Sequence, residues 1–255
     1  MKKADDLSLE KTLTFAQHCY EAKHTNSGEE LLLHCKKVAY QAETIAQKLY
    51  QDLRPEYIPE NAKDSITAIV HCGILHDVLN VKACAFENIA EIANVQIAAM
   101  VAALSRDFRL VETKRDMEFR GRLSQSAVGT QIVAVADIIC TARELLKGLE
   151  LLGISIVPKS KKMLAQLDGD LLAVHAAGKY YMLRMYVHAA RNLLVDVSHK
   201  IKECRQKAKQ EKAILQTTKK LQESIAAKEK EARKPKEKKQ EVRYARKRNI
   251  RADSE

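Results

Sequence analysis

The apolar residues of this chain recur every three or four positions, which is the period of one face of an α-helix. The pattern predicts helices over Leu9 to about Ala22, Glu30 to Leu53, Phe86 to Ala93, Val95 to Ser105, residues 130–152 and 160–175, and from Gly178 onward. A further helix containing Ile66 and Leu75 is apolar almost all round, so we expect it to lie at the centre of the fold.

Polar segments separate these predicted helices. KHTNSGEE contains Gly28 as its turn residue, and RPEYIPEN holds two of the four prolines and is predicted to be a loop. Asn61 or Asp64 can cap the central helix, which should end at His76. The charged stretch SRDFRLVETKRDMEFRGR is the best candidate for a mobile loop or short helix over a site.

Composition supports an all-helical protein. The 255 residues include only 8 glycines, 4 prolines and no tryptophan. The longest apolar runs are too short to cross a bilayer, and the opening MKKADDLSLEK lacks the apolar region of a signal peptide. The 6 cysteines lack CxxC spacing, which favours buried free thiols in a reducing compartment. We therefore expect a soluble cytoplasmic protein that does not bind membranes.

Charge divides the chain into two parts. Residues 1–199 carry 24 Lys+Arg and 24 Asp+Glu, whereas the last 56 residues carry 20 and 9, so their difference of +11 is the whole net charge. This predicts a globular domain over 1–199 and a basic extension over 200–255. The extension is predicted to be helical in its first half and disordered past Pro235. It could contact nucleic acid without sequence preference, because Tyr244 is its single aromatic residue, or it could simply aid solubility.

The adjacent pair His76-Asp77, in IVHCGILHDVLN, is the main candidate for chemistry. It offers one nitrogen and one oxygen ligand at the end of a rigid helix. His34 and Asp137 lie in other apolar helical stretches, and a buried carboxylate such as Asp137 needs a partner. Two imidazoles and two carboxylates suit manganese, iron or magnesium with open positions for water and phosphate. Taken one by one, the four residues could also be capping or core polar groups.

Four segments together resemble the RelA/SpoT-type HD hydrolases. SGEELLLHCKKVA, GILHDV, VAALSRD and SAVGTQIVAVADIICTARELL are similar to elements of that family, in the family's order, over roughly residues 9–195. The resemblance implies an α-helical HD domain in which His34, His76, Asp77 and Asp137 hold a divalent metal, with manganese the first choice and magnesium or iron as alternatives. It also implies removal of the 3′ pyrophosphate from (p)ppGpp, with Asp77 steering the attacking water.

The chain departs from the family at several positions. Asn80 and Val81 stand where the family has the Glu-Asp pair that orients water. Thr25 replaces an Arg that helps to hold the base, and Ala134 and Thr141 replace a Lys and an Asn. A different phosphorylated substrate, or a reduced or lost activity, fits these replacements better than hydrolysis of (p)ppGpp. Asn80 can still hold a water by a hydrogen bond; the alternative is a simple helix end.

Further residues are candidates for binding substrate. Arg106, Arg109, Lys114 and Arg115 lie where a phosphate-rich ligand would approach, although a solvated charged loop explains them equally well. Arg143 matches the family's Arg and is expected on a buried face, with an ion-pair or phosphate role. His71 is more simply a core histidine than a partner of the site.

These observations favour a cytoplasmic, divalent-metal-dependent phosphohydrolase of the HD superfamily, with Asp77 and Asn80 in the catalytic roles and a nucleotide or related phosphate ester as substrate. The alternative is a catalytically degenerate HD protein that binds a nucleotide or a partner, with the basic extension contacting nucleic acid. The sequence leaves the oligomeric state open.

Overall fold

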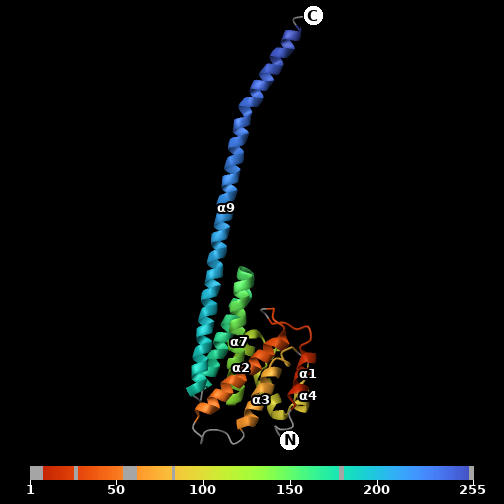
Figure 1. Cartoon of the computed structure of the whole chain (residues 1–255), viewed down its shortest axis with the longest axis vertical. Coiled ribbons are helices and arrows are strands. Elements are labelled where there is room, and N and C mark those ends of the chain that lie inside the picture. Colours follow the sequence, from red (N-terminus) through yellow and green to blue (C-terminus); the bar gives the residue numbers. More distant parts are fainter. Residues whose placement is uncertain (1–7, 26–27, 54–61, 82–83, 178–180, 253–255) are drawn as a thin grey trace. The chain divides into compact units, whose positions relative to one another are not determined.

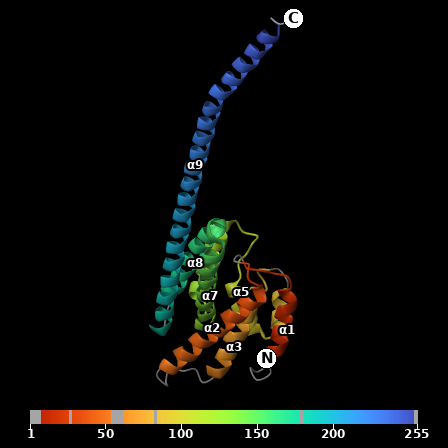
Figure 2. The ribbon, with the colours of Figure 1, turned by 45° about the horizontal axis from the view of Figure 1, so that its top comes forward.

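The computed structural model describes residues 8–25, 28–53, 62–81, 84–177 and 181–252. Side chains are described up to residue 229, except at 63, 64, 177, 181 and 182. It divides the chain into two units, Met1–Cys204 and Arg205–Glu255. Figures 1 and 2 show the elements of each unit.

Within the described ranges the secondary structure is helical, apart from an isolated bridge between His24 and Glu30. The helices are α1 (Leu9–Cys19), α2 (Leu31–Asp52), α3 (Ala62–Leu75), α4 (Phe86–Ile92), α5 (Val95–Leu104), α6 (Glu112–Gln125), α7 (Val128–Leu152), η3 (Gly153–Ile156), α8 (Val157–Ala177) and α9 (Tyr181–Ala252). The all-α prediction is therefore confirmed, and most predicted boundaries differ from those of the structure by one to three residues.

Local sequence explains several helix ends. Ser8 caps α1 by accepting a hydrogen bond from the Lys11 amide at 3.3 Å, and Asn94 caps α5 by accepting one from the Ile97 amide at 2.8 Å. Gly153 ends α7 with φ of +57°, a conformation that glycine adopts without strain. The predicted loop over 54–61 and the proposed cap at Asn61 lie outside the described residues.

Helices α2, α3 and α7 pack side by side at the centre of the first unit (Figure 1). The face of α2 predicted to be apolar, which includes Val38, Ala42 and Ile45, is fully buried. Gly73 of α3 allows the closest approach, since a Cβ there would lie 2.6 Å from the Ala39 Cα of α2. The central position predicted for the helix before His76 is therefore confirmed.

The charged stretch after α5 forms an irregular segment and then the 14-residue helix α6, which packs against α8. Gly169 of α8 makes room for this contact, because a Cβ there would collide with the guanidinium group of Arg120. Pro158 lies in the first turn of α8, where its missing N–H leaves no helical hydrogen bond broken. The segment predicted as a loop or short helix is thus mostly a helix.

The second unit consists of the later part of α9. Its described side chains, residues 205–229, are exposed except for the half-buried Ala208. The helix continues to Ala252, past Pro235, where disorder was expected. Residues 236–252 are mostly Lys, Arg, Glu, Gln and Ala, and these residue types favour helix.

The six cysteines are free thiols, and all but the half-buried Cys84 are buried. Among the described residues, no helix combines the length and apolar character needed to traverse a lipid bilayer.

Candidate metal centre

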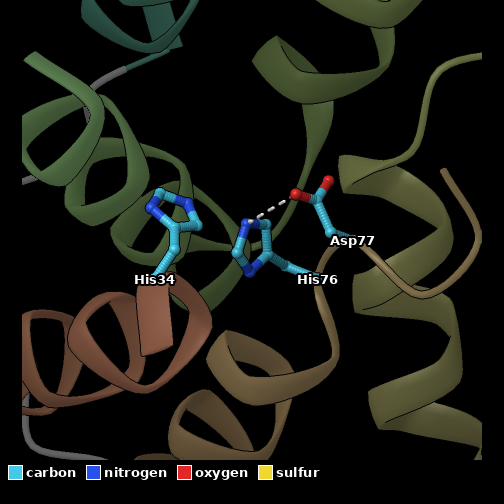
Figure 3. A group of neighbouring side chains, drawn as sticks. All are labelled: His34, His76 and Asp77. Carbon is cyan, nitrogen blue, oxygen red and sulfur yellow. Dashed lines mark ion pairs between the residues drawn. The ribbon is translucent and has the colours of Figure 1, made fainter. Parts of the chain in front are cut away.

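Three packed helices bring the predicted ligands together. His34 lies in the first turn of α2, His76 and Asp77 directly follow the last residue of α3, and Asp137 lies midway along α7. Figure 3 shows the His34 and His76 rings facing the same space, with Asp77 beside His76. The two ring centroids are 5.6 Å apart. Residues separated by more than 100 positions in sequence thus share one site.

The orientation of His76 leaves one nitrogen available. Its Nδ1–H donates to the Gly73 carbonyl at 2.8 Å, so the hydrogen-bonded nitrogen points back into α3. Its Nε2 is buried and has no hydrogen-bond partner, and lies 3.7 Å from Asp77 Oδ2 and 3.8 Å from Asp137 Oδ1. A buried nitrogen between two carboxylates is what a metal-ligating histidine presents before the cation is added.

His34 lies between two carboxylates. Its Nε2 is 3.1 Å from Asp137 Oδ1, and its Nδ1 is 2.7 Å from Glu144 Oε1. Thr141 donates to the same Asp137 oxygen at 3.1 Å. Glu144 therefore fixes the ring while the other nitrogen faces the site, an arrangement common at metal-bound histidines.

The pKa values describe a site that needs positive charge. Burial lowers the pKa of His34, but hydrogen bonds to Asp137 and Glu144 outweigh it and raise the value to about 10. Burial raises the pKa of Asp137, but the hydrogen bond from His34 outweighs it and brings the value to about 2. The pKa of His76 is also raised to about 10, chiefly by the neighbouring Cys35 and Asp77, although burial alone lowers it. Without a cation, protons on the imidazoles balance the carboxylates.

Among the residues that the structure describes, two groups of side chains have donor atoms close enough for one ion. One consists of His34, His76 and Asp77, and the other of Glu29, His34 and Glu144; within each, the ligand atoms lie within 4.8 Å of one another. The first group, with Asp137 in contact with both imidazoles, contains the four predicted ligands. Neutral imidazoles with carboxylates suit a divalent cation that keeps open positions.

Asn80 positions Asp77. Its amide nitrogen donates to Asp77 Oδ1 at 2.7 Å, and its amide oxygen accepts the Arg106 backbone N–H at 2.9 Å. Tyr20 supports the same turn, because its hydroxyl donates to the Ile74 carbonyl at 3.1 Å and accepts the Asp77 N–H at 3.3 Å. Asn80 thus connects the carboxylate to the segment that leads into α6, and it is more than a helix end.

Three of the candidate ligands, His34, Asp77 and Asp137, line a cavity of about 380 Å³, whereas His76 is buried and does not line it. Leu104, Phe108, Phe119, Met163 and Leu167 give part of its wall an apolar character. The cavity is large enough for a small organic phosphate next to the candidate metal centre.

The predicted phosphate-binding cations are not equivalent. Arg106 and Arg115 line the cavity, whereas Lys114 and Arg109 do not. Arg106 is bound by Asp116 and Asp170, each at 2.5 Å, which leaves Arg115 as the less engaged cation.

Arg115 lies over the Phe108 ring with its Nε buried and unpartnered. The Arg109 side chain is 91% exposed and pairs with Asp107.

Arg143 is not on a buried face, so that expectation is wrong. Its side chain is exposed and donates to Gln41 at 3.0 Å, outside the cavity. Arg143, six residues after Asp137, lies about 240° further around the helix. Glu144, seven residues after Asp137, returns to the same face. The spacing of seven is the signal that could have identified Glu144 in the sequence.

Two other residues that contribute to the site had no such spacing signal in the sequence. Asp170 and Asp116 were not among the predicted residues, and they hold Arg106 from α8 and α6. His71 is buried and hydrogen-bonded to Thr12 at 2.8 Å, away from the cavity, in agreement with a core histidine.

The helical arrangement of this chain is similar to that of an all-helical HD-domain hydrolase. One similar solved structure is a metazoan ortholog of SpoT that hydrolyses ppGpp and plays a role in starvation responses. The two are 12% identical, with a TM-score of 0.53, over 72% of this chain and 94% of the other. At that identity the likeness establishes the fold alone. The sequence matches no family model. No curated protein matches it either.

Proposed function

We propose that residues 1–199 form a divalent-metal-dependent phosphohydrolase of the HD superfamily, acting on a nucleotide or related phosphate ester. The observation that carries this proposal is the unpartnered, buried Nε2 of His76, which faces Asp77 and Asp137 with His34 opposite. Manganese is the preferred ion, with magnesium or iron as alternatives.

The residues present fit such an ion. His34, His76, Asp77 and Asp137 would supply two nitrogen and two oxygen ligands, and Glu144 and the Gly73 carbonyl would hold the two rings. A bound divalent ion would lower the pKa of a coordinated water and offset the negative charge that develops on the phosphoryl group.

The protein's own groups would then position the reactants. Asn80 fixes one oxygen of Asp77 by a hydrogen bond, so the other oxygen is aimed at the site. Arg115 lies at the cavity wall with an unpartnered Nε and can meet a substrate phosphate. Phe108 and Phe119 would contact the organic part of the substrate. Asn80 cannot accept a proton, so Asp77 is the candidate group for steering water.

Metal analysis combined with a nucleotide phosphohydrolase panel, with and without manganese, tests the proposal. We expect stoichiometric metal and release of phosphate or pyrophosphate from at least one nucleotide or phosphate ester. Tight metal binding without any release would reject the enzyme while retaining the metal site. Absence of metal binding would reject both.

The alternative, a non-catalytic HD protein that binds a nucleotide or partner, is favoured by one contact. Both ends of the Asn80 amide are engaged, with Asp77 and with the Arg106 backbone, so the residue acts as a structural link where the resembling family has an acid. The double variant Asn80→Glu with Val81→Asp separates the two functions. Hydrolysis gained only in this variant would indicate a degenerate site, whereas hydrolysis already present in the unaltered chain would exclude the alternative.

The basic extension supports a second function, contact with nucleic acid. On a helix with 100° per residue, Ile214, Leu221 and Ile225 fall within about 40° of one another. Of the seven cations in residues 205–229, five lie on the opposite face and two, Lys207 and Lys228, lie near the apolar residues. The five are Arg205, Lys209, Lys212, Lys219 and Lys220. Cations on one helix face can contact backbone phosphates without reading bases. Removing residues 205–255 should abolish retention of an RNA or DNA oligonucleotide at 50 mM salt; unchanged retention would reject this function.

A further inference from the structure

A second hollow lies on the other side of Glu144 from the candidate metal centre, between α2 and α7. It has a volume of about 490 Å³, which is within the range of sites that bind small molecules. Four cations line it: Lys36 and Lys37 from α2, and Arg143 and Lys147 from α7. This hollow is where the structure places Arg143, which the sequence had suggested for the first site.

The density of cations at this hollow is higher than the average composition of the domain would give. Residues 1–199 carry equal numbers of acidic and basic side chains, so four cations around one hollow are a local feature. Arg143 and Lys147 lie four residues apart on one face of α7, whereas Lys36 and Lys37 are consecutive on α2 and lie about 100° apart around that helix. Packing of α2 against α7 brings the two pairs to the same hollow.

Most of this positive charge is not neutralised by the protein. Lys37 pairs with Glu29, and Glu144 is hydrogen-bonded to His34. Lys36, Arg143 and Lys147 form no ion pair with a described residue, and all three side chains are exposed. Arg143 is instead held by the neutral Gln41 oxygen, which orients its guanidinium while leaving the charge available.

An aromatic ring completes the hollow. Tyr40 is 73% exposed although it lies on α2 one turn after Lys36, where nearby apolar residues such as Val38 are buried. An exposed ring beside several unneutralised cations matches the two halves of a nucleotide, a planar base and a phosphate chain. A plain solvated helix face would explain the lysines but gives no reason for the hollow around the ring.

We propose that this hollow, lined by Lys36, Tyr40, Arg143 and Lys147, is a second ligand site that binds a free nucleotide, with the base on Tyr40 and the phosphates on the cations. The site lies outside the metal centre and does not depend on hydrolysis. Glu144 lines both cavities and holds His34, so the two sites share one wall.

Fluorescence titration of the full chain with an N-methylanthraniloyl-labelled ADP, in EDTA to remove metal from the first site, tests the proposal. We expect saturable binding that is weakened about tenfold or more in Lys36→Ala with Lys147→Ala, and also in Arg143→Gln, because hydrogen bonds to charged groups are lost. Tyr40→Ala should weaken binding about fivefold or more, whereas Tyr40→Phe keeps the ring and should stay within about twofold.

The double variant Lys48→Ala with Lys161→Ala is the matched control, because it removes two exposed cations that line neither cavity. Circular dichroism melting confirms that each variant is folded. Equal weakening in the control, or no saturable binding in the unaltered chain, would overturn the proposal. Sensitivity to the cations with none to Tyr40→Ala would overturn the nucleotide as ligand, since phosphate alone would then suffice.

Discussion

Residues up to Cys204 and residues from Arg205 onward are both largely helical, yet their helices form for different reasons. In the first unit, α2 and α7 bury continuous apolar faces, and residues 1–199 are neutral overall. In the second unit the described apolar side chains are exposed, for example Leu215 at 71%, and the charge is strongly positive. Helix propensity alone thus gives a helix, but a site requires helices that pack and hold side chains in place.

The largest expected effect concerns which unit binds the metal and carries out turnover. His76→Ala should abolish metal retention and any turnover, because it removes the buried nitrogen between Asp77 and Asp137. Deletion of residues 205–255 should leave both unchanged. Metal content by mass spectrometry and phosphate release measure the two effects, with the exposed His199→Ala as control. Metal loss on deletion of the second unit would contradict the division.

Core truncation should separate the two kinds of helix. Leu75 is fully buried, so Leu75→Ala should lower the free energy of unfolding by about 2–5 kcal/mol. Leu221 is 61% exposed, and Leu221→Ala should change the stability of the first unit by less than about 0.5 kcal/mol. Urea denaturation followed by circular dichroism measures both changes. Similar losses of unfolding free energy for the two variants would show that the apolar face of α9 around Leu221 is buried in solution.

Two glycines of the first unit differ in how closely other helices approach them. Gly73→Ala places a Cβ 2.6 Å from the Ala39 Cα, so α2 and α3 must move apart, at about 1–3 kcal/mol. A Cβ at Gly121 of α6 meets nothing within 4 Å, so Gly121→Ala should stabilise by about 0.5–1 kcal/mol. Thermal melts of the two variants should therefore shift in opposite directions. A stabilising Gly73→Ala would rule out the close approach of α2 and α3.

The smallest effect concerns pH. Burial lowers the pKa of His71 in the folded state, so the unfolded chain binds more protons at this residue below about pH 6.5. Stability from His71 is therefore present above that pH and is lost as the pH falls, with a slope of at most about 1.4 kcal/mol per pH unit.

His71→Gln should flatten the dependence of unfolding free energy on pH between 5 and 7, whereas the exposed His199→Gln should not. An unchanged slope in His71→Gln would show that the imidazole titrates alike in both states.

Much of the fold was predictable because it follows from local patterns. The apolar spacing of α2, including Ile45 and Leu49, identified its buried face, and the apolar character of α3 predicted its central place. Past Pro235 the polar composition favoured disorder, whereas α9 continues to Ala252 and the residue types there have high helix propensity.

The candidate ligands were identifiable for a similar reason. A histidine or carboxylate within an apolar helical stretch, such as His34 or Asp137, conflicts with its surroundings and therefore stands out. The sequence could not show which nitrogen of His76 faces the site, since that depends on the carbonyl of Gly73 in the preceding turn.

By itself the sequence determined the helices, the neutral and basic parts of the chain, and four residues suited to a divalent ion, because periodicity, charge and ligand chemistry are properties of short segments. Only the tertiary structure decided that Glu144 rather than Arg143 faces His34, that Arg106 is bound by two carboxylates, and that Arg143 joins Lys36, Tyr40 and Lys147 around a separate hollow. Those relations depend on how helices that are distant in sequence rotate and pack against one another. The sequence pattern of a single helix does not specify the orientation of its neighbour.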